Sequence, residues 1–162
     1  MRGRRSDRRR DTVNMAAVDV EVHTTIDRPR REVAAYCCDP GNVTAWNANI
    51  HTVQWDSREI AAGAQLRFTS DFLGRRLEYT YEVAELIPEE RLVMRSDRGT
   101  FLMETTYLWE DDEQGGTWMT LRSRGEPTAF AGLSATILAT AVRRATASDL
   151  AQLKAILEGV NL

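Results

Sequence analysis

Apolar and polar residues alternate along much of the chain, with the two-residue period of β-strands that bury one face. Residues 18–26 show this pattern first, and residues 49–125 repeat it between short turn sequences such as Leu73-Gly74. The strands predicted in the second region cover residues 49–57, 64–72, 75–86, 91–97, 101–110 and 117–125. Connections this short allow antiparallel hairpins but no parallel crossovers. The pattern therefore predicts a first strand and an antiparallel meander of six more.

Two regions follow the helical period instead. Residues 29–37 form a short predicted helix that ends before Asp39-Pro40, and a further helical turn is expected before Trp46. The second region begins after Pro127 and runs to about residue 158, and some 30 residues of helix would span roughly 45 Å. Its apolar stripe is predicted to contain Phe130, Leu133, Ile137 and Ala141, followed by Leu150, Leu153 and Leu157.

Strand parity separates an aromatic face from a charged face. The predicted inner face collects large apolar side chains, among them Trp55, Phe68, Tyr79, Tyr81, Met94, Phe101, Met103, Tyr107 and Trp109. The opposite face holds charged residues such as Arg95 and Glu104. We expect that face to be solvated, with cross-strand ion pairs that each contribute little.

The net charge of −3 is an average over two unlike parts of the 162 residues. Residues 1–14 contain six arginines and two aspartates, a net charge of +4, which leaves −7 on the remainder. Nucleic-acid binding requires clustered Lys and Arg, so the acidic part is not expected to bind nucleic acid. We predict a disordered basic tail at residues 1–14 and a single domain at residues 15–162.

Cofactor and membrane signals are missing from the sequence. Cys37 and Cys38 are adjacent, cannot form an unstrained disulfide and are too few for a metal site, so they are expected to be reduced thiols in a cytoplasmic protein. Residues 127–142 carry no charge but are shorter than the roughly 20 apolar residues of a membrane span, so a buried helix is expected there. No phosphate loop, dinucleotide fingerprint or HExxH motif occurs, and no metal or cofactor is expected.

Several short motifs follow one another along the chain. They are a D-P-x-x-x-x-x-W run from Asp39 to Trp46, Gly63 before a strand, residues 81–88 followed by Arg91-Leu92, residues 105–110, Gly115-Gly116-Thr117, and Leu153-Lys154 with Glu158. With the order of the elements, they resemble the START/Bet v 1-like (SRPBCC) superfamily, in particular its bacterial polyketide cyclase/dehydrase-like branch. The likeness covers about residues 17–160.

That resemblance implies an α+β helix-grip fold. In this fold a seven-stranded antiparallel curved sheet wraps around a long C-terminal helix, and two short helices follow strand 1. A deep apolar cavity between sheet and helix holds a hydrophobic ligand. The candidate ligand-binding residues here are Trp46, Trp55, Phe68, Tyr79, Tyr81, Met94, Phe101, Met103, Tyr107, Trp109, Phe130, Leu133 and Ile137. Each could equally be an ordinary core residue, and the tyrosines are the strongest candidates because a buried phenol needs a hydrogen-bond partner.

The sequence gives fewer indications of catalytic residues than of ligand-binding ones. His23 lies on the outer parity, whereas the register of His51 is open, so it can be placed at the cavity mouth as a general base. The candidate catalytic residues are therefore His51, Tyr79 and Tyr107.

Three functions remain open. The first is binding, for storage, transport or presentation, of a hydrophobic small molecule such as a lipid or polyketide. The second is a cyclase or dehydratase acting on a polyketide-like substrate, which would hold a flexible chain in a reactive fold and leave almost no motif. The third is a protein-interaction module of the same fold. The expected partner is a hydrophobic small molecule, and the chain is expected to be a monomer or homodimer.

Overall fold

The computed structural model describes residues 18–57, 59–96, 98–99 and 102–159. The predicted basic tail and the start of the predicted domain lie outside the described residues. The elements in chain order are β1 (Val18–Ile26), α1 (Arg30–Cys37), the 3₁₀-helix η1 (Pro40–Asn42), α2 (Val43–Trp46), β2 (Ile50–Trp55), β3 (Gln65–Phe72), β4 (Arg75–Ile87), β5 (Arg91–Arg95), β6 (Leu102–Asp111), β7 (Thr117–Glu126), the 3₁₀-helix η2 (Thr128–Phe130) and α3 (Ala135–Glu158).

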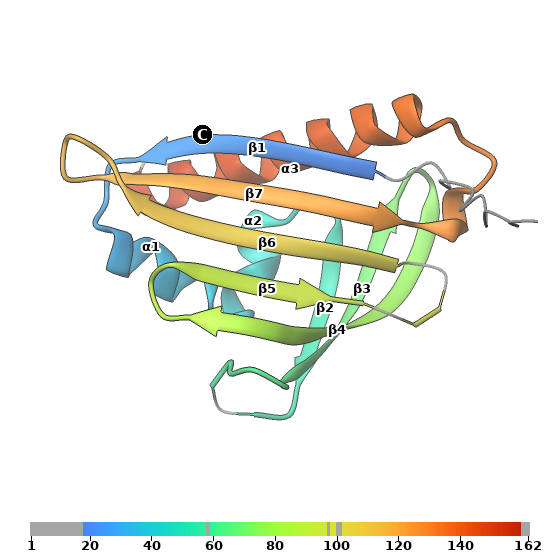
Figure 1. The fold of residues 1–162 in the computed structure, drawn as a ribbon, viewed down its shortest axis with the longest axis horizontal. Helices are drawn as coiled ribbons and strands as arrows, with labels where there is room; N and C mark the ends of the chain where they lie inside the picture. The colour runs from blue at the N-terminus through green and yellow to red at the C-terminus, as the bar shows by residue number, and fades with distance from the viewer. Residues whose placement is uncertain (1–17, 58, 97, 100–101, 160–162) are drawn as a thin grey trace, which may run out of the picture.

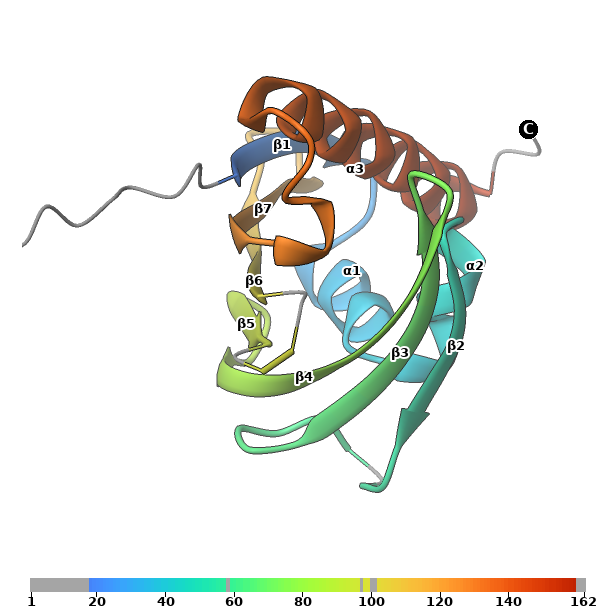
Figure 2. The same ribbon diagram turned by 90° about the vertical axis from the view of Figure 1, so that its right-hand side faces the viewer.

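The seven strands form one antiparallel sheet in the order β1-β7-β6-β5-β4-β3-β2. Successive strands from β2 to β7 are neighbours, and β1 pairs with β7 over its whole length, from Val18 opposite Gly125 to Ile26 opposite Thr117. The sheet curves strongly, and α3 lies along its open side while α1 and α2 occupy one end (Figures 1 and 2). The predicted helix-grip architecture is confirmed, with strand ends within two residues of the predicted ones.

Local backbone features account for the curvature and the tight turns. The pairing of β2 with β3 shifts between Ile50 and Thr52, and such irregularities bend a strand. The β3–β4 turn places Leu73 and Gly74 at positive φ angles of 50° and 76°, the conformation that two-residue hairpins require. Asp39 accepts a hydrogen bond from the backbone N–H of Gly41, and this bond begins the turn that leads through η1 into α2.

The helix α3 begins later than predicted. Ser134 is extended, and its hydroxyl accepts a hydrogen bond from the N–H of Ile137, so a new helix begins at Ala135. The expectation of one buried helix over residues 127–142 is therefore wrong. Leu133 and Ile137 are 40% and 56% exposed, which corrects their placement in the inner stripe. The inward face instead carries Leu138, Val142, Thr146, Asp149, Leu150 and Leu153.

Hydrogen bonds join the C-terminal end of α3 to the end of β1. The ammonium group of Lys154 donates hydrogen bonds to the backbone carbonyl of Thr25 and to the carboxylate of Glu158. The same carboxylate accepts a hydrogen bond from the backbone N–H of Asp27 at 3.0 Å. These contacts join the C-terminal end of α3 to the end of β1 at one edge of the sheet.

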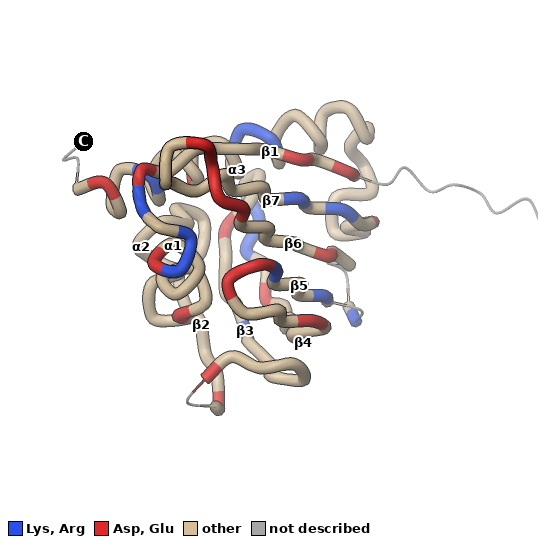
Figure 3. Tube along the Cα trace, turned by 60° about the vertical axis from the view of Figure 1, so that its left-hand side comes forward, with Lys and Arg blue, Asp and Glu red and all other residues tan. Residues whose placement is uncertain are grey.

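Charged residues recur along the neighbouring strands of the sheet (Figure 3). Those at the predicted outward positions, such as Arg95 and Arg124, are exposed. Glu104 on β6 pairs with Arg95 on β5 and Arg124 on β7, and Arg122 pairs with Asp19 on β1. Most of these side chains are exposed, so each pair contributes little to stability. Among the described residues, no helix is both long and apolar enough to cross a membrane.

Candidate ligand-binding cavity

A cavity of about 160 Å³ lies between the concave face of the sheet and α3. An apolar cavity of roughly 150 Å³ is already large enough to hold a benzene molecule. Most of the wall is apolar, and it is built from six of the seven strands, from α1 and α2, and from α3. Seven of the predicted ligand-binding residues line it, namely Phe68, Tyr79, Tyr81, Met94, Met103, Tyr107 and Phe130.

Three aromatic rings from β3 and β4 form one cluster in this wall. Phe68 stacks on Tyr79 with ring centroids 5.5 Å apart and meets Tyr81 edge-on at the same distance. The Tyr81 hydroxyl lies 3.3 Å from the hydroxyl of Thr105, and Tyr79 interacts with the side chain of Ser70. Burial raises the pKa of both phenols, so they stay neutral and can exchange hydrogen bonds with a ligand.

Tyr107 on β6 lies among larger aromatic groups. Its ring centroid is 6.0 Å from those of Trp46 and Trp109. Burial is the main cause that holds the pKa of Tyr107 well above its usual value, and its hydroxyl makes no hydrogen bond with the described residues. Trp46 and Trp109 are fully buried in the core beside the cavity but are not part of its wall, which corrects the expectation that they contact a ligand.

Three further candidate ligand-binding residues lie away from the cavity, and a fourth lies outside the described residues. Trp55 is 39% exposed, and it lies at the end of β2, which is an edge strand of the sheet. Leu133 and Ile137 are turned outward because α3 begins only after Ser134. Phe101 lies outside the described residues.

His51 lies on the outer surface rather than at the cavity mouth. The register shift in β2 directs His51 outward, where its Nε2 lies 2.6 Å from a carboxylate oxygen of Asp71. Asp71 also accepts a hydrogen bond from Arg76 at 3.0 Å, and this bond, with that of His51, lowers the pKa of the carboxyl. The structure thus gives His51 no access to a ligand in the cavity.

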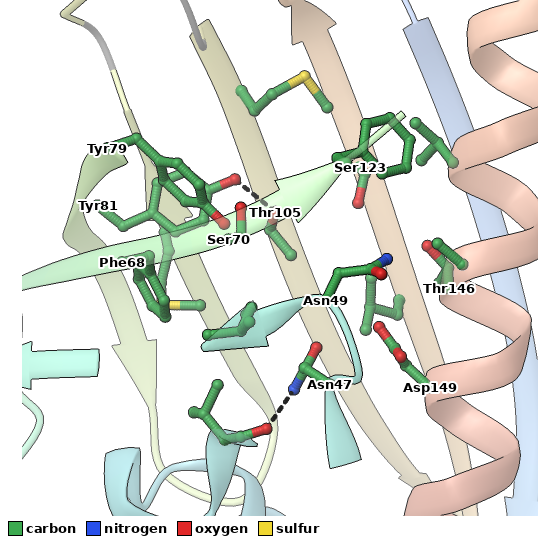
Figure 4. Close-up of a pocket in the computed structure, with 18 of the residues that line it drawn as sticks. Asn47, Asn49, Phe68, Ser70, Tyr79, Tyr81, Thr105, Ser123, Thr146 and Asp149 are labelled. Atoms are coloured by element: carbon green, nitrogen blue, oxygen red, sulfur yellow. Dashed lines mark hydrogen bonds between the residues drawn. The ribbon is translucent and has the colours of Figure 1, made fainter. Parts of the chain in front are cut away.

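A polar cluster that the sequence analysis missed lies at the α3 side of the cavity. It consists of Asn47 and Asn49 from the α2–β2 segment, Ser123 from β7, and Thr146 and Asp149 from α3 (Figure 4). Thr146 and Asp149 interrupt the apolar face of α3 at helical spacing from Leu138 and Leu153, and that interruption was the available signal.

Asp149 is the chemically distinctive member of this cluster. Its carboxylate accepts a hydrogen bond from the backbone N–H of Ala48 at 3.3 Å. Burial raises the pKa of Asp149 to about 6, because the charged form loses hydration that this one bond does not replace. No Lys, Arg or His is among the described residues that line the cavity, so Asp149 has no cationic partner there.

The cavity adjoins a groove on the outer surface between the β3–β4 turn and the first half of α3. Asn49, Phe72 and Ala145 line both the cavity and the groove. Leu73 and Ile137 are exposed along the groove. These three shared residues therefore separate the cavity from the groove.

The two cysteines are free thiols, and burial disfavours the thiolate form of both. Cys37 lines the cavity, and burial raises the pKa of its thiol strongly, whereas the pKa of Cys38 rises to about 11. Within the described part of the chain, no group of three His, Cys, Asp or Glu side chains is placed to hold a metal ion.

Solved structures of several bacterial proteins share this fold. TTHA0849 from Thermus thermophilus has a TM-score of 0.72 at 22% identity, over 88% of this chain and 97% of that one. The Zhui aromatase/cyclase from Streptomyces sp. R1128 has a TM-score of 0.71 at 17% identity, over 88% and 94%. Ms6760 from Mycobacterium smegmatis has a TM-score of 0.66 at 12% identity, over 90% and 94%. At these identities the likeness shows the fold alone.

Sequence comparison identifies the family. No curated protein matches the chain significantly. A family model described as polyketide cyclase / dehydrase and lipid transport matches residues 17–158, which is most of the chain and the whole of the described fold up to the end of α3. The chain belongs to the polyketide cyclase/dehydrase and lipid transport family.

Proposed function

We propose that this protein binds a hydrophobic small molecule in the cavity between the sheet and α3, in order to store, transport or present it. The observation that carries the proposal is the cavity itself, an apolar-walled space of about 160 Å³ in a fold whose other inward side chains are closely packed. An unfilled apolar space costs stability, so a packed core without a ligand role would be expected to close it. The family match supports the same class of ligand.

The wall limits the chemistry of that ligand. Phe68, Tyr79 and Tyr81 offer aromatic faces, which favour a flat or ring-containing molecule. The neutral hydroxyl groups offer hydrogen bonds at fixed positions, as small-molecule sites usually do. A lipid or polyketide fragment of one or two rings with few polar groups fits this description best.

Two measurements test this proposal. Native mass spectrometry of the purified protein is expected to show a retained small molecule, or an apo protein that takes up one equivalent of the neutral probe N-phenyl-1-naphthylamine. Fluorescence titration with the same probe is expected to saturate at one site. If a broad panel of neutral apolar probes neither saturates nor raises the melting temperature, the proposal is wrong.

A second candidate function is a cyclase-type enzyme that uses the same cavity. It is favoured by Asp149, whose pKa of about 6 is close to the working pH that a general acid or base needs. Tyr107, whose hydroxyl makes no hydrogen bond with the described residues, is the second candidate for proton transfer. The Streptomyces aromatase/cyclase shares the fold, which supports this candidate only by analogy.

An assay for turnover of a poly-β-ketone thioester distinguishes a cyclase from a protein that only binds its ligand. If the protein is a cyclase, we expect cyclised product. Asp149→Asn and Tyr107→Phe should then lower kcat at least tenfold, and His51→Ala should change it little. Absence of product from a protein that still binds the neutral probe would exclude the cyclase and leave the binding function in place.

A further inference from the structure

The polar cluster of Asn47, Asn49, Ser123, Thr146 and Asp149 has hydrogen-bonding capacity that the protein does not use. Ser123 and Thr146 are each only 9% exposed, yet their hydroxyl groups make no hydrogen bond with the described residues. Both residues line the cavity, and neither hydroxyl oxygen is among the fully buried atoms without a partner. The two hydroxyls therefore open to the cavity, where a ligand can supply their hydrogen bonds. Figure 4 shows these side chains directed toward the same end of the cavity as the Asp149 carboxylate.

Asp149 and Asn47 add acceptors to the cluster, whereas the Asn49 amide can both donate and accept. Asp149 receives one hydrogen bond, from the backbone N–H of Ala48, and its second oxygen has none from the described residues. The Asn47 amide donates to the backbone carbonyl of Val43 at 3.0 Å, which leaves its own oxygen free for the cavity. Carboxylate and amide oxygens are acceptors, so the cluster is better matched to a ligand group that donates a hydrogen bond.

The charge of Asp149 further restricts which ligands the cavity can bind. Asp149 is the one acidic or basic residue among the described residues of the wall, and no cation faces it. A carboxylate or phosphate at this end of the cavity would meet Asp149 without a compensating positive charge, in a partly buried site where repulsion is poorly screened. A hydroxyl group would instead give the carboxylate the partner that it lacks.

We propose that this polar cluster binds the hydroxyl or phenol group of an otherwise apolar ligand, and that Asp149 rejects carboxylate ligands of the same size. The inference rests on the proposed binding function and names the class of ligand that the cavity selects. It predicts that a free fatty acid or an aromatic acid is a poor ligand and that an alcohol or phenol of the same skeleton is a good one.

The groups that face Asp149 make its titration simple to follow. Tyr107 on β6 interacts electrostatically with Asp149, and burial raises the pKa of this phenol, so it stays neutral below pH 8. Cys37, the last residue of α1, also lines the cavity, and burial keeps its thiol neutral as well. The neighbouring α2–β2 segment contributes amides and the N–H of Ala48, and β7 contributes Ser123. On α3 itself, Lys154 is bonded to Thr25 and Glu158, away from the cluster.

Three naphthalene probes test the proposal on the full-length protein. Naphthalene, 2-naphthol and 2-naphthoate share one skeleton and differ in the polar group, and each competes with N-phenyl-1-naphthylamine in a fluorescence titration. At pH 7.5 we expect 2-naphthol to bind about tenfold more tightly than 2-naphthoate and at least threefold more tightly than naphthalene. At pH 5 the deficit of 2-naphthoate is expected to shrink severalfold, because Asp149 is then protonated while the probe remains an anion.

Matched variants assign the selectivity to the cluster. Asp149→Asn is expected to remove most of the preference for 2-naphthol over 2-naphthoate, whereas Asp71→Asn, on the outer surface, is expected to keep it. Thr146→Val has nearly the same shape, and it is expected to weaken 2-naphthol severalfold relative to naphthalene. This second variant keeps the test decisive if Asp149→Asn does not fold.

The outcomes separate the two proposals. If no probe binds the wild-type protein, the binding function itself fails. If all three probes bind with similar affinity, or if Asp149→Asn and Thr146→Val both keep the wild-type preference, the cavity binds apolar ligands but the inference about the polar cluster is overturned.

Discussion

The carboxylate of Asp149, in the middle of α3, accepts a hydrogen bond from the backbone N–H of Ala48, which is 101 positions earlier in the chain. This contact joins α3 to the α2–β2 segment at the edge of the cavity and holds the carboxyl group in a partly buried position. Because one hydrogen bond does not replace full hydration, the protein carries a carboxyl whose charged form is disfavoured.

Asp149→Asn is expected to stabilise the protein at neutral pH. The pKa is about 6 in the folded chain against 3.8 for the ordinary group, so between these values the native state binds more protons than the unfolded state. Stability therefore falls as pH rises through the window from about 4 to 6 and stays level above it. The asparagine amide of the variant still accepts the hydrogen bond from Ala48 and carries no charge to desolvate. We therefore expect the variant's free energy of unfolding to be higher by about 1 kcal/mol, after allowance for partial solvent contact.

Urea denaturation at pH 8 and pH 4.5 checks this expectation. The variant should be the more stable protein at pH 8, and the difference should be much smaller at pH 4.5, because most of the window in which Asp149 titrates lies above that pH. A variant that is less stable than the wild type at both values would show that the carboxylate is a stabilising group and that its environment has been misjudged.

Tyr81→Phe is expected to cost about 1 kcal/mol of unfolding free energy, the usual value for a buried neutral hydrogen bond. The Tyr81 hydroxyl and the Thr105 hydroxyl are 3.3 Å apart in the cavity wall, and the substitution leaves Thr105 without this partner. Tyr36→Phe is the matched control, because Tyr36 is only partly buried and its hydroxyl makes no hydrogen bond with the described residues. Equal losses in the two variants would contradict the assignment.

Gly125→Ala is expected to destabilise the protein by about 3 kcal/mol or more. Gly125 has a φ of 152°, and a Cβ placed there would be 2.1 Å from the backbone carbonyl oxygen of Leu102 on the neighbouring strand. Gly132→Ala has open space around it and is expected to change stability by no more than about 0.5 kcal/mol. Thermal unfolding of both variants provides the comparison, and a tolerated Gly125→Ala would mean that β6 and β7 do not approach this closely.

Lys154→Met is expected to loosen the C-terminal end of α3 at a cost of about 1 kcal/mol. It removes the hydrogen bonds to Thr25 and Glu158 and keeps a side chain of similar length. Hydrogen exchange should increase in the last turns of α3 and at the end of β1. Arg144→Met on the same helix serves as the control. Similar exchange in both variants would argue against a stabilising role of the Lys154 hydrogen bonds.

The sheet could be predicted from the sequence because its signal is local. Alternation within each strand and a short turn after it determine both strand and pairing, and the turn at Leu73-Gly74 is one example. His51 shows the limit of this signal. The register shift between Ile50 and Thr52 depends on pairing with β3, and it moved His51 to the outer face.

The helix α3 shows a different limit. Residues 128–133 are apolar and rich in alanine, so propensity allows helix there, but Ser134 caps a new helix and changes which face points inward. Asp149 and Thr146 then lie on the inner face, although polar residues in a helix usually face solvent. Part of the aromatic wall was therefore predicted, whereas the polar cluster needed the structure.

The proposed uptake of a hydrophobic ligand between the sheet and α3 is tested most directly by one pair of variants. Ala145 lines the cavity and the groove beside it, whereas Ala147 on the same helix is exposed. Fluorescence titration with N-phenyl-1-naphthylamine is expected to give one saturable site in the wild type and in Ala147→Phe, and binding at least tenfold weaker in folded Ala145→Phe. Equal binding by the two variants, or no saturable binding by the wild type, would contradict the claim.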